Sequence, residues 1–154
     1  MDVPRPSTRA GAAQRVSRFS LVRSRVVHVI ERELDNQLVI LRAARGAGTT
    51  EAIAQTLASV RRRGDRAVAR VSADTGATSV WRCVLEALEE DPALPVPTGS
   101  EPEAARDVDL LGARLGGSAA VVAIDDVDAV TADALASDLL TLLETCPGLC
   151  VIVA

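Results

Sequence analysis

A short glycine-containing segment has the residue types of a loop that binds phosphate. In the motif Gly-x-x-x-x-Gly-Lys-Ser/Thr, backbone N–H groups surround phosphate oxygens, the lysine contacts the phosphates and the hydroxyl contacts Mg²⁺. Alignment on Gly48 places Ala43 at the first glycine. The same alignment places Thr49 at the lysine and Thr50 at the hydroxyl. All 17 basic residues of the chain are arginines, so no lysine elsewhere can replace the missing one.

This loop predicts a weakened nucleotide site. Loss of one charge-assisted contact to phosphate costs about 2–3 kcal/mol, which is roughly a tenfold to hundredfold loss of affinity. An arginine within the loop is an alternative cation, although its planar fork is a poor substitute for a slender lysine. A glycine-rich turn between a strand and a helix can also be purely structural. The predicted nucleotide-binding residues are Arg45, Gly46, Ala47, Gly48, Thr49 and Thr50.

An apolar run that ends in two aspartates, Asp125 and Asp126, has the pattern of the acidic half of a nucleotide site. There, a carboxylate at a strand end holds Mg²⁺, usually through water, and a neighbouring acid orients the attacking water. We therefore predict that Asp125 and Thr50 bind the metal and that Asp126 is the catalytic residue. The simpler interpretation is that both aspartates, with Asp128, are loop and helix-cap acids.

The elements that must position these residues alternate between strands and helices. Apolar runs predict strands over residues 37–42, 67–72, 119–124 and 149–153. Helical spacing of apolar residues predicts helices over residues 24–36, 49–63, 79–88, 103–115 and 131–144. In the last helix, one apolar face is expected to hold Leu135, Leu139, Leu140 and Leu143. Such alternation implies parallel pairing, which places the glycine loop at the carboxyl end of the first strand, where open α/β sheets bind ligands.

Composition bounds the function further. The 154 residues suit one domain, and the net charge of −4 gives no support for nucleic-acid binding. Cys83, Cys146 and Cys150 are expected to be reduced, structural thiols of a cytoplasmic protein, although the last two have a spacing that could hold a metal. No apolar run reaches the roughly 20 residues that span a bilayer. Trp81 is expected to be a core residue and His28 a helix-surface or packing residue.

Several segments share their order and residue types with one family. They are residues 19–27, the loop at 41–50, the strand and Trp-containing helix at 71–88, the acidic strand at 122–128, and residues 139–154. This order resembles the nucleotide domain of large ATP-binding LuxR-type transcriptional regulators. Those regulators are the MalT-like members of the signal-transducing STAND ATPases, which are relatives of the AAA+ class.

The resemblance implies an α/β fold: a P-loop NTPase-like three-layer sandwich with a parallel sheet of about four strands in the order 1-4-3-2. It would occupy residues 19–154, after a flexible arm at residues 1–18. In the family a fifth strand, a lid and a DNA-binding region follow. We therefore expect the chain to be truncated on its C-terminal side, with its first strand at a sheet edge.

The implied function is a switch in which ATP and Mg²⁺ gate the assembly of a regulator. Thr49 at the lysine position implies that nucleotide binding is weak or lost and that NTPase activity is not efficient. The expected partners are other proteins or the remainder of a larger regulator, without direct nucleic-acid contact by this chain and without a membrane. The alternative is a protein-interaction scaffold that keeps the P-loop fold and no longer uses nucleotide.

Overall fold

The computed structural model describes residues 23–44, 46–74, 79–89, 91–94 and 106–154. The predicted arm at residues 1–18 and most of the proline-rich segment after Asp91 lie outside these ranges. Helices and strands alternate along the chain. They are α1 (Ser24–Glu33), β1 (Leu38–Ile40), α2 (Thr49–Arg63), β2 (Ala67–Ser72), α3 (Val80–Leu88), α4 (Asp107–Leu115), β3 (Ala120–Asp125), α5 (Ala129–Thr145) and β4 (Leu149–Val153).

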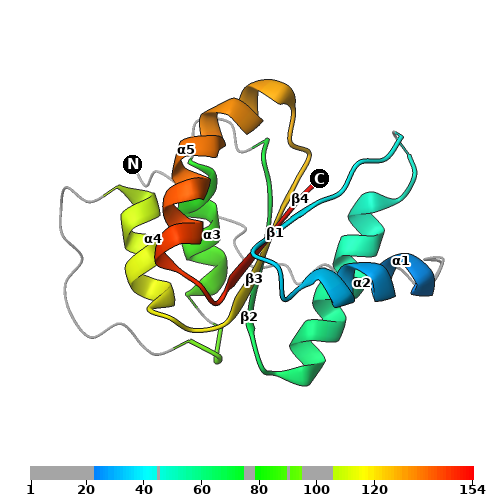
Figure 1. The fold of residues 1–154 in the computed structure, drawn as a ribbon, viewed down its shortest axis with the longest axis horizontal. Helices are drawn as coiled ribbons and strands as arrows, with labels where there is room; N and C mark the ends of the chain where they lie inside the picture. The colour runs from blue at the N-terminus through cyan, green and yellow to red at the C-terminus, as the bar shows by residue number, and fades with distance from the viewer. Residues whose placement is uncertain (1–22, 45, 75–78, 90, 95–105) are drawn as a thin grey trace, which may run out of the picture.

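The four strands form one parallel sheet in the order β1-β4-β3-β2. This arrangement confirms the predicted α/β class and the predicted strand order 1-4-3-2. In Figure 1 the helices α3, α4 and α5 lie to the left of the sheet, and α1 and α2 lie to its right. The molecule therefore has three layers, consistent with a P-loop-like sandwich.

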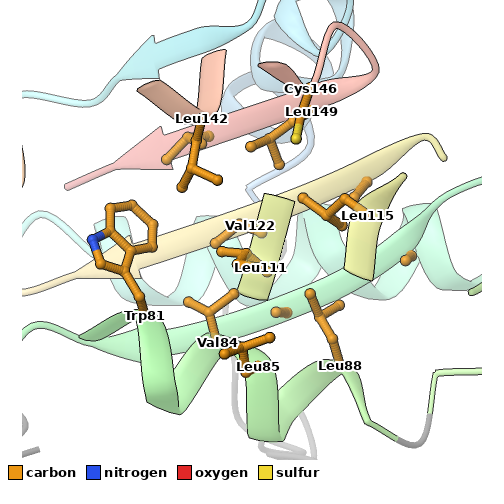
Figure 2. Close-up of a cluster of buried hydrophobic side chains, with 14 of the residues drawn as sticks. Trp81, Val84, Leu85, Leu88, Leu111, Leu115, Val122, Leu142, Cys146 and Leu149 are labelled. Carbon is orange, nitrogen blue, oxygen red and sulfur yellow. The ribbon is translucent and has the colours of Figure 1, made fainter. Parts of the chain in front are cut away.

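Each face of the sheet carries its own apolar core. All six residues of β3 are buried, as expected for a strand covered on both faces. Its residues alternate between the two cores, with Val122 on the side of α3, α4 and α5 and Val121 on the side of α1 and α2. Figure 2 shows the first core, where the ring of Trp81 lies near the side chain of Leu142 on α5. Burial of Trp81 confirms its predicted structural role.

Glycines and a cap residue explain several helix boundaries. The predicted bounds of α2 are matched, and the helix ends before Gly64, which adopts a left-handed conformation with φ 69°. In α5 the carboxylate of Asp128 accepts a hydrogen bond from the Thr131 N–H at 2.7 Å. This hydrogen bond lowers the pKa of Asp128, so the helix-cap interpretation is confirmed for this acid. The helix consequently begins at Ala129, before its predicted start.

The predicted apolar face of α5 is wrong at one position. Leu140 is 61% exposed, whereas Leu142 is 1% exposed and fully packed. Leu142 follows Leu135 by two helical turns, so both project toward the sheet, while Leu140 is rotated away from them. Leu135, Leu139 and Leu143 are partly buried against the same core. The leucine-rich sequence allowed two neighbouring faces, and packing selected one.

The two edge strands of the sheet have different surroundings. On β2 the Val68 N–H donates to Asp91 Oδ2 at 3.0 Å, and the Val68 carbonyl accepts from Arg61 Nη2 at 3.2 Å. On β1 the exposed residues are Leu38 and Ile40, the latter with 59% of its surface accessible. The first strand is thus an edge strand, as expected, and it carries exposed apolar side chains.

Candidate functional site

The glycine loop joins the carboxyl end of β1 to the first turn of α2. Gly46 and Gly48 have φ values of 81° and 83°, in the left-handed region that glycine adopts without steric cost. The Ala47 N–H donates to the Ala44 carbonyl at 3.0 Å, which closes the turn. The predicted residue Arg45 lies outside the described residues. The other five predicted residues, Gly46 to Thr50, form one continuous turn at the start of a helix.

The first turn of α2 presents backbone donors at this loop. Gly48 occupies the N-cap position and has no side chain to satisfy the N–H groups that follow it. Thr49 and Thr50 are the first two helical residues, and Thr50 is exposed. The positive end of the helix dipole also lies here, which favours an anionic ligand. The loop therefore has the backbone chemistry of an anion site, with a threonine at the lysine position.

Arg23 brings a positive charge to this loop from the residue just before α1. A Cβ atom on Gly48 would lie 2.6 Å from the Cζ atom of Arg23, so the guanidinium covers the glycine directly. The Arg23 backbone N–H donates to Gln55 Oε1 at 3.1 Å. The Gln55 amide in turn donates to Glu51 Oε1 at 3.1 Å. Sequence reasoning missed Arg23, because only the packing of α1 against α2 brings it to the loop.

Gly48→Ala is expected to lower the free energy of unfolding by about 1–2 kcal/mol, because an L side chain is strained in the left-handed region. The guanidinium of Arg23 would also have to move. Urea unfolding of the variant and of the wild type measures the loss. Gly64→Ala is the matched control. Gly64 also has positive φ, so the variant has the same backbone strain, but nothing lies within 4 Å of its Cβ position and no side chain has to move. A loss in the control with none in Gly48→Ala would contradict the described loop conformation.

Asp125 ends β3 as a buried carboxylate. It is 4% exposed, and its Oδ2 atom accepts a hydrogen bond from Arg70 Nη2 at 2.9 Å. Its Oδ1 atom accepts from the Asp126 backbone N–H at 3.2 Å. Arg70 lies on β2, opposite Ala123 in the neighbouring strand. Alternation along the strands places both side chains on the face that α1 and α2 cover.

Asp126 lies at the surface beside the end of β2. Its φ of 61° makes it the described non-glycine residue with a left-handed backbone, a conformation that aspartate tolerates better than most residues. Its Oδ2 atom accepts a hydrogen bond from the Ser72 hydroxyl at 3.3 Å. Backbone strain of this kind is found at functional sites, and here it turns Asp126 away from the buried position of Asp125. The catalytic role of Asp126 stays a prediction.

Both parts of the predicted site lie at the end of the sheet that the carboxyl ends of its strands form. The glycine loop follows β1 and the aspartates end β3, with β4 between the two strands. Because all the strands are parallel, their carboxyl ends share the same edge (Figure 1). A ligand in an α/β sheet of this type binds outside that edge. The topology thus brings the glycine loop and the two aspartates to the same end of the sheet.

Asp125 in this arrangement is poorly suited to a magnesium ion, because a positively charged side chain is already paired with it. Each of its oxygens accepts one hydrogen bond, and one of the two comes from the Arg70 guanidinium. Among the described residues, no three His, Cys, Asp or Glu side chains are grouped so as to hold a metal. Metal binding by Asp125 and Thr50 would place the cation beside the Arg70 guanidinium. Arg70 is the second residue that sequence reasoning missed, although a charge within an apolar strand was a usable signal.

The three cysteines and His28 lie apart from the predicted site in kind and in burial. Cys83, Cys146 and Cys150 are free, and the last two are buried. Burial raises the pKa of the Cys150 thiol to about 11, so this thiol is neutral and unreactive at neutral pH. The predicted structural role of these two cysteines agrees with their burial. His28 lies exposed on α1.

In the part of the chain that the structure describes, no helix combines the length and the apolar character needed to cross a membrane. No protein-family model matches the sequence, and no curated protein matches it. The likeness to STAND ATPases therefore rests on the residues quoted above.

Proposed function

We propose that this chain is a degenerate ATP-binding switch domain of a STAND/LuxR-type, signal-transducing transcriptional regulator. The observation that carries the proposal is the glycine turn at Gly46 and Gly48. It connects the carboxyl end of β1 to the uncapped N-terminus of a 15-residue helix. This is the position and the backbone chemistry with which α/β domains bind phosphate.

In the proposed complex, backbone N–H groups of the glycine loop and of the first turn of α2, other than that of Ala47, donate to the phosphate oxygens of ATP. Thr50 adds a hydroxyl, and the helix dipole favours the negative charge. Arg23 contributes a charge at the same loop, where its guanidinium covers Gly48. Thr49 has no charge to offer, so we propose that the site binds weakly and that it has no efficient NTPase activity.

We further propose that the bound nucleotide acts through protein contacts in the cytoplasm. The net charge of −4 gives no field that would attract nucleic acid to this chain. Exposed Leu38 and Ile40 on the β1 edge are a surface that other protein segments can cover. Protein partners, or the remainder of a larger regulator, would read the nucleotide state.

Thr49→Lys is expected to strengthen ATP binding at least tenfold. The new ammonium would supply a charge-assisted contact worth about 1.5–3 kcal/mol. Isothermal titration of ATP into the wild type and the variant measures the change. Thr49→Met is the matched control, since it adds length without charge and is expected to leave the affinity near that of the wild type.

The outcomes separate the proposal from its alternative. Equal affinities for wild type and Thr49→Lys would show that the loop does not surround phosphates. No binding by either protein, with both folded, would favour the nucleotide-independent scaffold. Binding by the lysine variant alone would identify a preserved loop whose site has lost its function.

A further inference from the structure

Asp125, the predicted metal ligand, is already paired with Arg70. The side chains of Arg70 and Asp125 are 20% and 6% exposed, so the pair is largely removed from water. It lies at the carboxyl end of β2 and β3, on the face that α2 covers. The remaining oxygen of Asp125 is held by the next peptide N–H. Each oxygen of the carboxylate therefore accepts one hydrogen bond from the protein itself.

This pairing changes the electrostatics of the predicted site. An unpaired carboxylate beside a triphosphate repels it, and a magnesium ion between them removes the repulsion. Here the guanidinium of Arg70 neutralises Asp125 before any ligand arrives. The pair forms within the protein itself, so this neutralisation needs no bound ion. A divalent cation at Asp125 would instead be placed next to a fixed positive charge.

We infer that Arg70 takes the place of magnesium in this domain, so that nucleotide binds at the glycine loop without a divalent cation. This inference rests on the proposed ATP-binding function. It adds one claim to that function, which is that ATP binding does not depend on a divalent cation. The ligand is free ATP, and the residue that makes the metal dispensable is Arg70.

The test is calorimetric titration of ATP in excess EDTA and in excess MgCl₂. For the wild type and for Thr49→Lys, the two dissociation constants are expected to differ by less than about tenfold. For Arg70→Gln, which leaves Asp125 available, binding is expected to become at least tenfold tighter in MgCl₂ than in EDTA.

Two further variants keep the test independent of folding defects. Arg66→Gln removes an arginine from the segment just before β2, where its guanidinium pairs with Asp35 at 2.8 Å, and it is expected to leave binding metal-independent. The double variant Arg70→Gln/Asp125→Asn keeps a neutral pair in place of the charged one. It is also expected to bind equally in both buffers, and it replaces Arg70→Gln as the informative protein if that variant does not fold.

The results separate a failure of the inference from a failure of the proposed ATP-binding function on which it rests. Wild-type binding that is at least tenfold tighter in MgCl₂ would overturn the inference and leave the proposed ATP-binding function intact. Metal-dependent binding by the double variant would also overturn the inference, because the metal would then act at a group other than the Asp125 carboxylate. No binding by folded wild type and folded Thr49→Lys in either buffer would overturn the proposed function and the inference together.

Discussion

Arg70→Ala is expected to lower the free energy of unfolding by about 3 kcal/mol, near the lower end of the range for breaking a buried ion pair. The variant would leave the carboxylate of Asp125 buried without its partner. The remaining exposure of the Arg70 side chain, 20%, lets some water reach the pair and moderates the loss. Urea unfolding followed by the fluorescence of Trp81, the single tryptophan, measures the effect.

Arg66→Ala is the matched control for this experiment. Arg66 also pairs with an aspartate, but the side chain of Asp35 is 89% exposed. Exposed ion pairs contribute about 0–1 kcal/mol, so the control should lose far less stability. The double variant Arg70→Ala/Asp125→Ala is expected to be more stable than Arg70→Ala, because it removes the unpaired charge. Equal losses in Arg70→Ala and Arg66→Ala would contradict the burial of the pair.

Leu142→Ala is expected to lower the free energy of unfolding by about 2–5 kcal/mol, as for other fully buried leucines. Leu142 projects from α5 into the core beneath α3 and α4 (Figure 2), and it is 1% exposed. The surrounding side chains come from three helices and the sheet, so they cannot all close on the space left by the truncation. The same urea unfolding experiment measures this loss.

Leu140→Ala provides the control on the same helix. Leu140 is two residues away and 61% exposed, so its truncation removes little buried surface. The expected change is within about 0.5 kcal/mol, as for ordinary surface substitutions. A larger loss for Leu140→Ala than for Leu142→Ala would mean that α5 packs through the face first expected from its leucine pattern.

The elements of the fold were largely predictable because their signals are local. The apolar runs and glycine stops placed α2, β2 and β4 at their observed bounds. β1 is shorter than predicted, with three residues instead of six, because pairing with β4 on one side alone decides its length. The start predicted for the helix at 103–115 falls on residues outside the described ranges, and the described helix α4 begins at Asp107.

The candidate site, like the fold, was predictable from the sequence only in part. The sequence by itself determined where a glycine turn and an acidic strand end could form, since glycine at 46 and 48 permits the observed positive φ and the apolar run of β3 predicts its burial. Only the tertiary structure placed Arg23 over the loop and Arg70 against Asp125. Both contacts join residues that are distant along the chain, through the packing of α1 on α2 and the pairing of β2 with β3. Local patterns set which backbone the chain forms, whereas long-range packing decides which charges meet there.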